Sequence, residues 1–329
     1  MQTLIEPMTL KAHGGAARHV LIRRTFALVA AVLAVSAAVM ISPAGAAASA
    51  TGTVIQAESS PYGTVLEVGS GAFAGYTVYQ FTRNTPAACT TKVVTVMGQP
   101  LSCAGPMTSH TADWPIVSTV GKPVAGKGVN KHLLGSVYRK DIKADQVTYG
   151  GKLLYLFDQK PNVFQGVNFV ETVLPLPPNH GIWFAVSAKN GLPATGPMTV
   201  TTQAQSGGTS VLAVDMFQGV GAGAIVVYSS SKDTKGHSKC TGSCALVWPP
   251  VLTSSTVSGP AGLPKGSFGT ITRADGTHQI TYNGHPLYFY DAEVAHLNPT
   301  TGQPLNPATT GSGDGVGGFH LVSVPASAG

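Results

Sequence analysis

The sequence consists of two similar halves, and this internal repeat constrains the fold more than any other feature. The halves span roughly residues 62–190 and 212–325. Matching landmarks occur in the same order in both: Tyr79 and Tyr228, Cys89 and Cys240, Cys103 and Cys244, Trp114-Pro115 and Trp248-Pro249, residues 154–158 and 287–291, and residues 181–187 and 317–323. Ordered self-similarity of this kind is typical of a duplicated structural unit. We therefore predict two tandem homologous domains, at residues 51–190 and 212–329. Residues 191–211 between them are rich in Thr, Gly, Ser and Pro, which predicts a linker or, as the alternative, a surface strand pair.

Local patterns within each half predict short β-strands. In the second half, alternating runs at 268–273, 277–282 and 286–290 are separated by Asp275-Gly276 and Asn283-Gly284, dipeptides that favour hairpin turns. In the first half Gly150-Gly151 takes the place of the second turn. A content of 40 Gly and 23 Pro in 329 residues also favours many turns. The prediction is an all-β chain of meander or sandwich-like domains with low helix content.

The first fifty residues have the layout of a secretory signal peptide. Four basic residues precede an apolar run at 26–41, and small residues follow at 44–50. The alternative is a transmembrane anchor, which needs about 20 apolar residues. The tetrapeptide at 23–26, Arg-Arg-Thr-Phe, matches the twin-arginine export signal in part. We expect residues 1–50 to be removed on export, which leaves a secreted or cell-envelope protein with no membrane span.

Charge and motif content exclude several classes of function. Removal of residues 1–50 takes four basic residues and one acidic residue, so the formal net charge falls from +6 to +3. No dense basic stripe remains, and we therefore expect no nucleic-acid partner. The sequence contains no nucleophile elbow, phosphate-binding loop, dinucleotide fingerprint or zinc-protease helix. We predict a protein without catalytic residues or cofactor.

Four cysteines in an exported protein predict two disulfides. The repeat pairs Cys89 with Cys103 and Cys240 with Cys244. The alternative is a soft metal site, for copper or a similar ion, formed by His237, Cys240 and Cys244. A cluster of Asp275, His278 and His285 is a further alternative for metal binding or acid–base chemistry.

Several residues of the second half resemble a known family. They are Tyr228, Cys240, Cys244, Trp248-Pro249-Pro250, the run T-R-A-D-G-T at 272–277 and the run Y-N-G-H-P-L-Y at 282–288. In order and spacing they resemble the bacterial secreted-repeat proteins, which are predicted lipoproteins with a Tyr-x-aromatic-x-x-Asp motif. The resemblance extends over both halves. It implies an exported envelope protein and supplies no substrate.

The family motif is degenerate in this chain. The position of its acid holds Asn84 after Tyr79, Lys160 after Tyr155, Asp233 after Tyr228 and Glu293 after Tyr288. No cysteine closely follows the apolar run, so the resemblance implies a secreted protein without a lipid anchor.

Aromatic residues two apart on a strand share one face of the sheet. Three such pairs occur: Tyr79 with Phe81, Tyr155 with Phe157, and Tyr288 with Tyr290. They predict either packing in the core or, if the rings are exposed, an aromatic groove that binds a glycan or another cell-wall component. The sequence thus predicts an exported, non-catalytic binding or structural protein whose partner is a cell-wall or extracellular component. The alternative is a secreted metal-binding, redox-linked protein.

Overall fold

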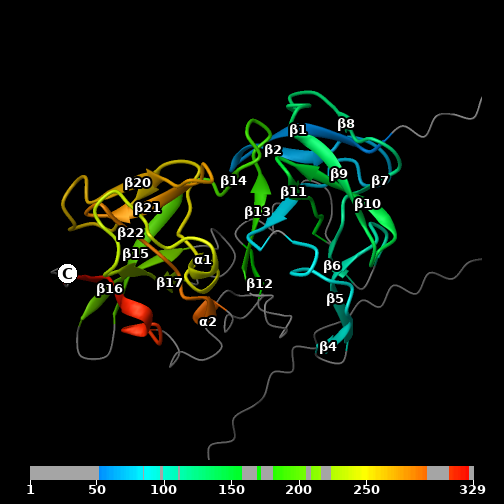
Figure 1. Cartoon of the computed structure of the whole chain (residues 1–329). Coiled ribbons are helices and arrows are strands. Elements are labelled where there is room, and N and C mark those ends of the chain that lie inside the picture. The colour runs from blue at the N-terminus through cyan, green and yellow to red at the C-terminus, as the bar shows by residue number, and fades with distance from the viewer. Residues whose placement is uncertain are drawn as a thin grey trace, which may run out of the picture. The chain divides into compact units, whose positions relative to one another are not determined.

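Short strands form nearly all the regular structure of this chain. The computed structural model describes residues 52–83, 85–96, 99–109, 112–157, 169–171, 181–204, 209–215, 224–294 and 311–325 (Figure 1). The expected signal peptide at 1–50 lies outside these residues. Within them the helices are two short α-helices and one 3₁₀ turn, and none is long and apolar enough to cross a membrane. The prediction of an all-β fold is confirmed.

The described residues of the first half form four small sheets. Its strands are β1 (Val54–Ser60), β2 (Gly63–Val68), β3 (Tyr79–Phe81), β4 (Val94–Val96), β5 (Gln99–Gly105), β6 (Ala112–Pro115), β7 (Ser118–Thr119), β8 (Val124–Ala125), β9 (Leu134–Arg139), β10 (Ala144–Tyr149), β11 (Lys152–Leu153), β12 (Phe169–Glu171), β13 (Gly181–Val186) and β14 (Pro193–Ala194). The sheets run β2-β1-β8, β4-β5-β6, β11-β10-β7 with β9 also on β10, and β12-β13-β14 with β3 also on β13.

In the part of the second half that the structure describes, the strands form three sheets. Its elements are β15 (Met198–Ala204), β16 (Ser210–Asp215), β17 (Ala224–Val226), β18 (Tyr228–Ser230), α1 (Ser243–Val247), β19 (Val257–Ser258), β20 (Phe268–Thr272), β21 (His278–Tyr282), β22 (His285–Pro286), α2 (Asp291–Val294), η2 (Val316–Gly318), β23 (Phe319–Leu321) and β24 (Ser323–Val324). The sheets run β17-β16-β15-β19 with β24 also on β16, β18-β23, and β20-β21-β22.

Between the halves the structure differs from the predicted linker and agrees with the alternative of a strand pair. Strand β15 lies inside the segment 191–211 and pairs with β16 on one side and β19 on the other. Its first three residues alternate between buried and exposed side chains, as expected for a strand at the surface of a core. Residues 198–204 and 210–211 of the expected linker are therefore part of the sheet of the second half.

The predicted meander of the second half is present as β20, β21 and β22. Asn283 and Gly284 between β21 and β22 both have positive φ, 49° and 84°, as a two-residue type I′ turn requires. Gly150 and Gly151 have positive φ at the corresponding turn of the first half. The third strand is shorter than predicted, because β22 ends at Pro286 and the chain continues through Tyr288 in isolated bridges.

The two halves make the same backbone contacts at corresponding positions. Tyr79 and Tyr155 exchange two backbone hydrogen bonds in the first half, and Tyr228 and Tyr288 exchange two in the second. Strand β1 pairs in parallel with β8, as β15 does with β19. The order of landmarks in the sequence thus corresponds to an order of contacts in space.

Strand β13 connects the hydrophobic cores of the halves. All six of its residues are buried. Trp183 and Ala185 pack in a cluster of the first half, whereas Ile182 and Phe184 pack in the main cluster of the second half. Because successive side chains of a strand point to opposite faces, one strand serves both cores. Residues 48–329 accordingly form one unit by their contacts.

Candidate functional site

The two motif tyrosines of the second half bond each other's motif acids. The Tyr228 hydroxyl donates to Oε1 of Glu293 at 2.5 Å, and the Tyr288 hydroxyl donates to Oδ2 of Asp233 at 2.5 Å. Each acid follows one tyrosine by five residues in the sequence but accepts from the other tyrosine. The backbone pairing of Tyr228 with Tyr288 places the two copies of the motif side by side, which makes this exchange geometrically simple.

Both tyrosine–acid pairs are buried. Burial raises the pKa of Tyr288 to about 12, and its hydrogen bond to Asp233 adds to this effect. Burial also raises the pKa of Tyr228, with further contributions from Glu293. The pKa of Glu293 is itself raised by burial, although hydrogen bonds from Tyr228, Gly313 and Ser312 oppose the shift. The two tyrosine hydroxyls therefore stay protonated near neutral pH and donate to the acids, as expected of groups that stabilise the fold.

The predicted aromatic pairs lie mostly in the core. Tyr79, Phe81, Tyr155 and Tyr288 are each at most 3% exposed, and Phe157 and Tyr290 are partly buried. The rings pack on tryptophans: Phe81 stacks on Trp183 and Tyr290 stacks on Trp248. A groove that binds a ligand on aromatic faces needs exposed rings, and four of these six rings do not offer them.

Both cysteine pairs are disulfides, as the repeat predicts. Cys89 is bonded to Cys103 and Cys240 to Cys244. Two of the three ligands of the alternative metal site, Cys240 and Cys244, are thus bonded to each other, and only His237 remains. The described part of the chain contains no group of three His, Cys, Asp or Glu side chains arranged to hold a metal ion, and this statement includes Asp275, His278 and His285.

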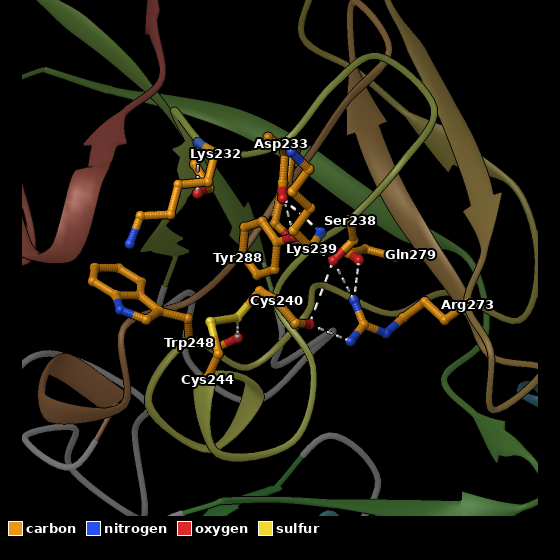
Figure 2. The surroundings of a disulfide bond; sticks show 12 residues. Lys232, Asp233, Ser238, Lys239, Cys240, Cys244, Trp248, Arg273, Gln279 and Tyr288 are labelled. Carbon is orange, nitrogen blue, oxygen red and sulfur yellow. Dashed lines mark hydrogen bonds between the residues drawn. A yellow bond between two sulfur atoms is a disulfide. The ribbon is translucent and has the colours of Figure 1, made fainter.

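Each half also contains a network of one arginine and one glutamine next to its disulfide. In the second half (Figure 2), Arg273 Nη1 donates to Oε1 of Gln279 at 2.6 Å and Nη2 donates to the carbonyl oxygen of Cys240 at 2.7 Å. Gln279 in turn donates to the carbonyl oxygen of Leu287. The arginine thereby joins the disulfide loop to the meander.

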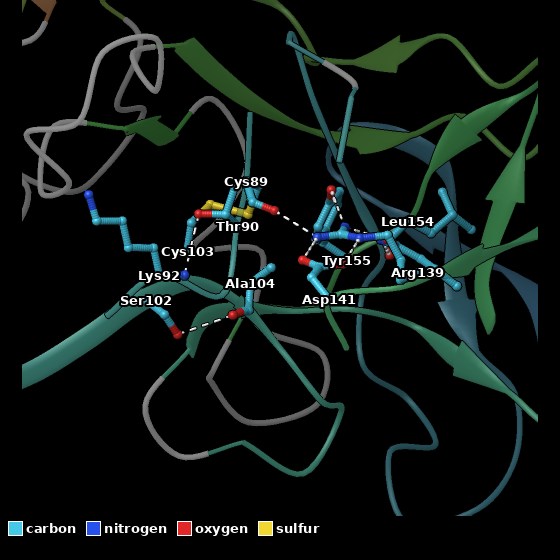
Figure 3. Close-up of polar contacts among 11 residues, drawn as sticks. Cys89, Thr90, Lys92, Ser102, Cys103, Ala104, Arg139, Asp141, Leu154 and Tyr155 are labelled. Atoms are coloured by element: carbon cyan, nitrogen blue, oxygen red, sulfur yellow. Dashed lines mark hydrogen bonds and ion pairs between the residues drawn. A yellow bond between two sulfur atoms is a disulfide. The ribbon is translucent and has the colours of Figure 1, made fainter. Parts of the chain in front are cut away.

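The first half repeats this arginine–glutamine network, and Figure 3 shows Arg139 bonded to Cys89 and Asp141. Arg139 Nη1 donates to Oε1 of Gln146 at 2.9 Å, Nη2 donates to the carbonyl oxygen of Cys89 at 3.0 Å, and Gln146 donates to the carbonyl oxygen of Leu154. Sequence reasoning did not identify these residues. The available signal was an arginine six or seven residues before a glutamine, ahead of the matched turn in each half.

The two arginines differ in their acidic partner. Asp141 accepts from Nε of Arg139 at 2.8 Å and from Nη2 at 2.7 Å, and these hydrogen bonds lower the pKa of Asp141. Asp275 stands at the same offset from Arg273, but its Oδ1 accepts from the hydroxyl and the backbone N–H of Thr277. Within the described residues, Arg273 has no carboxylate in hydrogen-bond distance and its Nε makes no hydrogen bond.

A cleft with a volume of about 220 Å³ lies beside Arg273. Residues from both halves line it. The charged lining residues are Arg83, Lys152, Arg273 and Asp275, and the apolar ones include Phe81, Phe184, Leu246 and Leu252. Arg83 is held by Asp291 at 3.2 Å and by the carbonyl oxygen of Leu246 at 2.9 Å. A cavity with apolar walls and a few fixed polar groups is the usual form of a small-molecule site.

Residues 269–296 match a family model described as a secreted repeat of unknown function. The matched segment contains the meander β20–β22 except for Phe268, the Arg273–Gln279 pair, and the motif from Tyr288 to Glu293. The match supports the resemblance drawn from the sequence and an exported location. No curated protein and no solved structure matches the chain.

Proposed function

We propose that this protein is an exported, non-catalytic binding protein of the cell envelope or the extracellular space, and that it binds its ligand in the cleft lined by both halves. Residues 1–50 serve as the signal peptide in this proposal. The family description supports export, and the two disulfides suit an oxidising compartment.

We further propose that the chain consists of two copies of one repeat. The matched tyrosine bridges, disulfides and arginine–glutamine networks support this duplication. The second copy would begin with β15 at Met198, because β15 holds the same place beside β19 that β1 holds beside β8. The first copy would end with β14.

One observation supports binding in the cleft: the motif residues make their contacts inside the protein, whereas the groups around the cleft are accessible. The motif tyrosines and acids, the cysteines and most paired aromatics are occupied by contacts inside the protein. The cleft, in contrast, presents Lys152, Arg273 and the side chain of Leu246, which is 40% exposed, to the outside. The residues that define the family motif thus act as scaffold, and the groups available to a ligand surround the cleft.

A sedimentation assay with bacterial cell-wall material tests this function. The purified protein is incubated with isolated cell-wall material, and the bound fraction is measured after centrifugation. Leu246→Asp places a charge in the cleft, and Val120→Asp is a matched control because Val120 is 70% exposed and lies outside the cleft lining. We expect binding of the parent and of Val120→Asp, and at least tenfold weaker binding of Leu246→Asp. Equal binding of all three proteins would place the site elsewhere, and no binding of the parent would contradict the proposed function.

A further inference from the structure

We propose that the cleft binds a small carboxylate with an apolar body, and that the carboxylate pairs with Nε and Nη2 of Arg273. This inference rests on the proposed function of the cleft and names the chemical class of its ligand. It follows from a comparison of the two arginine–glutamine networks of this chain.

Arg139 shows which group completes such a network. Its Nε and Nη2 form two parallel hydrogen bonds with Asp141, while Nη1 and Nη2 also hold the glutamine and the carbonyl oxygen of the disulfide loop. Parallel pairing of a guanidinium with a carboxylate is strong and geometrically specific. Arg273 keeps the glutamine and the carbonyl oxygen and lacks the carboxylate. The position that Asp141 occupies in the first half is therefore open in the second half.

The acid that could fill this position is held away from it. Burial opposes ionisation of Asp275, but hydrogen bonds from Thr277 and the positive charges of Arg273 and Lys152 outweigh burial and lower its pKa. Both bonds of Asp275 with Thr277 close the turn between β20 and β21. Arg273 meanwhile remains fixed by Ser238 Oγ at 3.0 Å as well as by the glutamine and the carbonyl oxygen. A fixed guanidinium binds a carboxylate with little loss of conformational entropy.

The charges of the cleft match a ligand with one negative charge. Arg83 is paired with Asp291, which leaves Lys152 and Arg273 as the cations not in a salt bridge and Asp275 as the acid of the lining. Lys152 makes no salt bridge or side-chain hydrogen bond within the described residues. The cleft lining therefore has a net charge of +1, and one ligand carboxylate neutralises it.

The walls of the cleft define the rest of the ligand. Phe81, Phe184, Leu246, Leu252 and three prolines supply apolar surface. The volume of about 220 Å³ is small compared with typical ligand pockets. This space suits a short aliphatic or aromatic body, whereas a bare inorganic anion would leave the apolar walls uncovered.

Titration with hexanoate tests the proposal, with hexanamide and inorganic phosphate as comparison probes. Binding to the purified protein is followed by isothermal titration calorimetry and by amide chemical shifts in two-dimensional NMR spectra. We expect hexanoate to bind at one site, with shifts confined to residues around the cleft, and hexanamide and phosphate to bind at least tenfold more weakly. Equal binding of hexanoate and hexanamide, or tighter binding of phosphate, would overturn the proposal.

Two kinds of variant test the role of the charged groups. Lys152→Gln should weaken the binding of hexanoate several-fold. Lys140→Gln is the matched control, because Lys140 is exposed and lies outside the cleft lining. Thr277→Val removes the hydroxyl that holds Asp275, so Asp275 can pair with Arg273 as Asp141 pairs with Arg139. Hexanoate binding should fall at least tenfold in Thr277→Val and return in Thr277→Val combined with Asp275→Asn. Parent-like binding by Thr277→Val would contradict the pairing with Arg273.

The hexanoate titration and the sedimentation assay distinguish failure of the ligand class from failure of the proposed function. If hexanoate does not bind but Leu246→Asp still abolishes sedimentation with cell-wall material, the ligand class is wrong and the binding function stands. If hexanoate binds as expected and no cell-wall material is bound, the carboxylate site stands and the envelope partner is wrong.

Discussion

Tyr288 donates its hydroxyl hydrogen to a buried carboxylate, and Tyr288→Phe removes this bond while it keeps the ring. The hydroxyl contacts Oδ2 of Asp233 at 2.5 Å and Oγ of Ser238 at 2.6 Å, and Tyr288 is fully buried. A hydrogen bond to a charged group contributes about 1.5–3 kcal/mol and a neutral one about 1 kcal/mol. We therefore expect Tyr288→Phe to lower the free energy of unfolding by about 3 kcal/mol, which corresponds to a fall in Tm of about 6–12 °C for a chain of this size.

Urea unfolding followed by tryptophan fluorescence measures this change. Tyr282→Phe is the matched control, because Tyr282 lies on the neighbouring strand β21, is partly exposed, and makes no side-chain hydrogen bond within the described residues. Its stability should stay within about 0.5 kcal/mol of the parent. A double-mutant cycle with Asp233→Asn should give a coupling energy of about 1–3 kcal/mol between positions 233 and 288.

The pKa of Tyr288 adds a pH signature. Because its folded-state pKa of about 12 lies above the ordinary value of 10, the protonated hydroxyl stabilises the fold fully below pH 10, and this contribution is lost as the pH rises through 12. The alkaline loss of stability should be smaller in Tyr288→Phe. If Tyr288→Phe unfolds at the same urea concentration as the parent, or if its coupling with position 233 is zero, the motif tyrosine does not hold the motif acid and our interpretation of the motif fails.

Three further perturbations test other parts of the structure. The disulfides close loops of 15 residues in the first half and 5 residues in the second. Removal of the first-half disulfide should lower the free energy of unfolding by about 3 kcal/mol, and removal of the second-half disulfide by about 2 kcal/mol. The first variant should therefore unfold at the lower denaturant concentration, and the reverse order would contradict the loop argument. Burial and the adjacent charge of Glu67 raise the pKa of Glu58 to about 7, so the stabilisation from its protonated form is present below about pH 4.5 and is lost as the pH rises through 7. The Tm of Glu58→Gln should therefore change less between pH 5 and 8 than that of the parent, and parallel curves would exclude the shift. Asp141→Ala leaves the buried guanidinium of Arg139 without its carboxylate and should lower the free energy of unfolding by about 2 kcal/mol. Because acetate supplies a carboxylate, 0.2 M acetate should raise the Tm of this variant more than that of the parent.

The repeated landmarks and the turns predicted most of the fold. Hairpin turns can be read from sequence because their positive φ angles restrict the residues that fit, as at Asn283-Gly284 and Gly150-Gly151. For strand β15 the sequence left a linker and a surface strand pair both open, because its threonines and the flanking glycines and serines resemble a linker in composition. Its assignment depends on pairing with β16 and β19, and pairing between distant segments has no local signal.

The contacts of the motif were less accessible to sequence reasoning. Spacing suggests that a tyrosine and an acid five residues later belong together, yet each tyrosine of the second half bonds the acid of the other copy. The pairing partner is decided by the bridge between Tyr228 and Tyr288, which joins positions 60 residues apart. A motif read within one copy therefore identifies the right residue types and the wrong partners.

The same limit applies to the arginine networks, where identical residue types at identical offsets behave differently. Asp141 and Asp275 each follow an arginine by two positions, and only Asp141 bonds its arginine. The difference follows from the residue two places further on, because Thr277 offers Asp275 a hydroxyl and a backbone N–H, whereas Lys143 at the matching place has no hydroxyl to offer. The hydroxyl and the backbone N–H of Thr277 together hold Asp275 away from Arg273. Under the proposed duplication and the proposed carboxylate site, such a local change converts a scaffold contact into a binding contact without altering the strands around it.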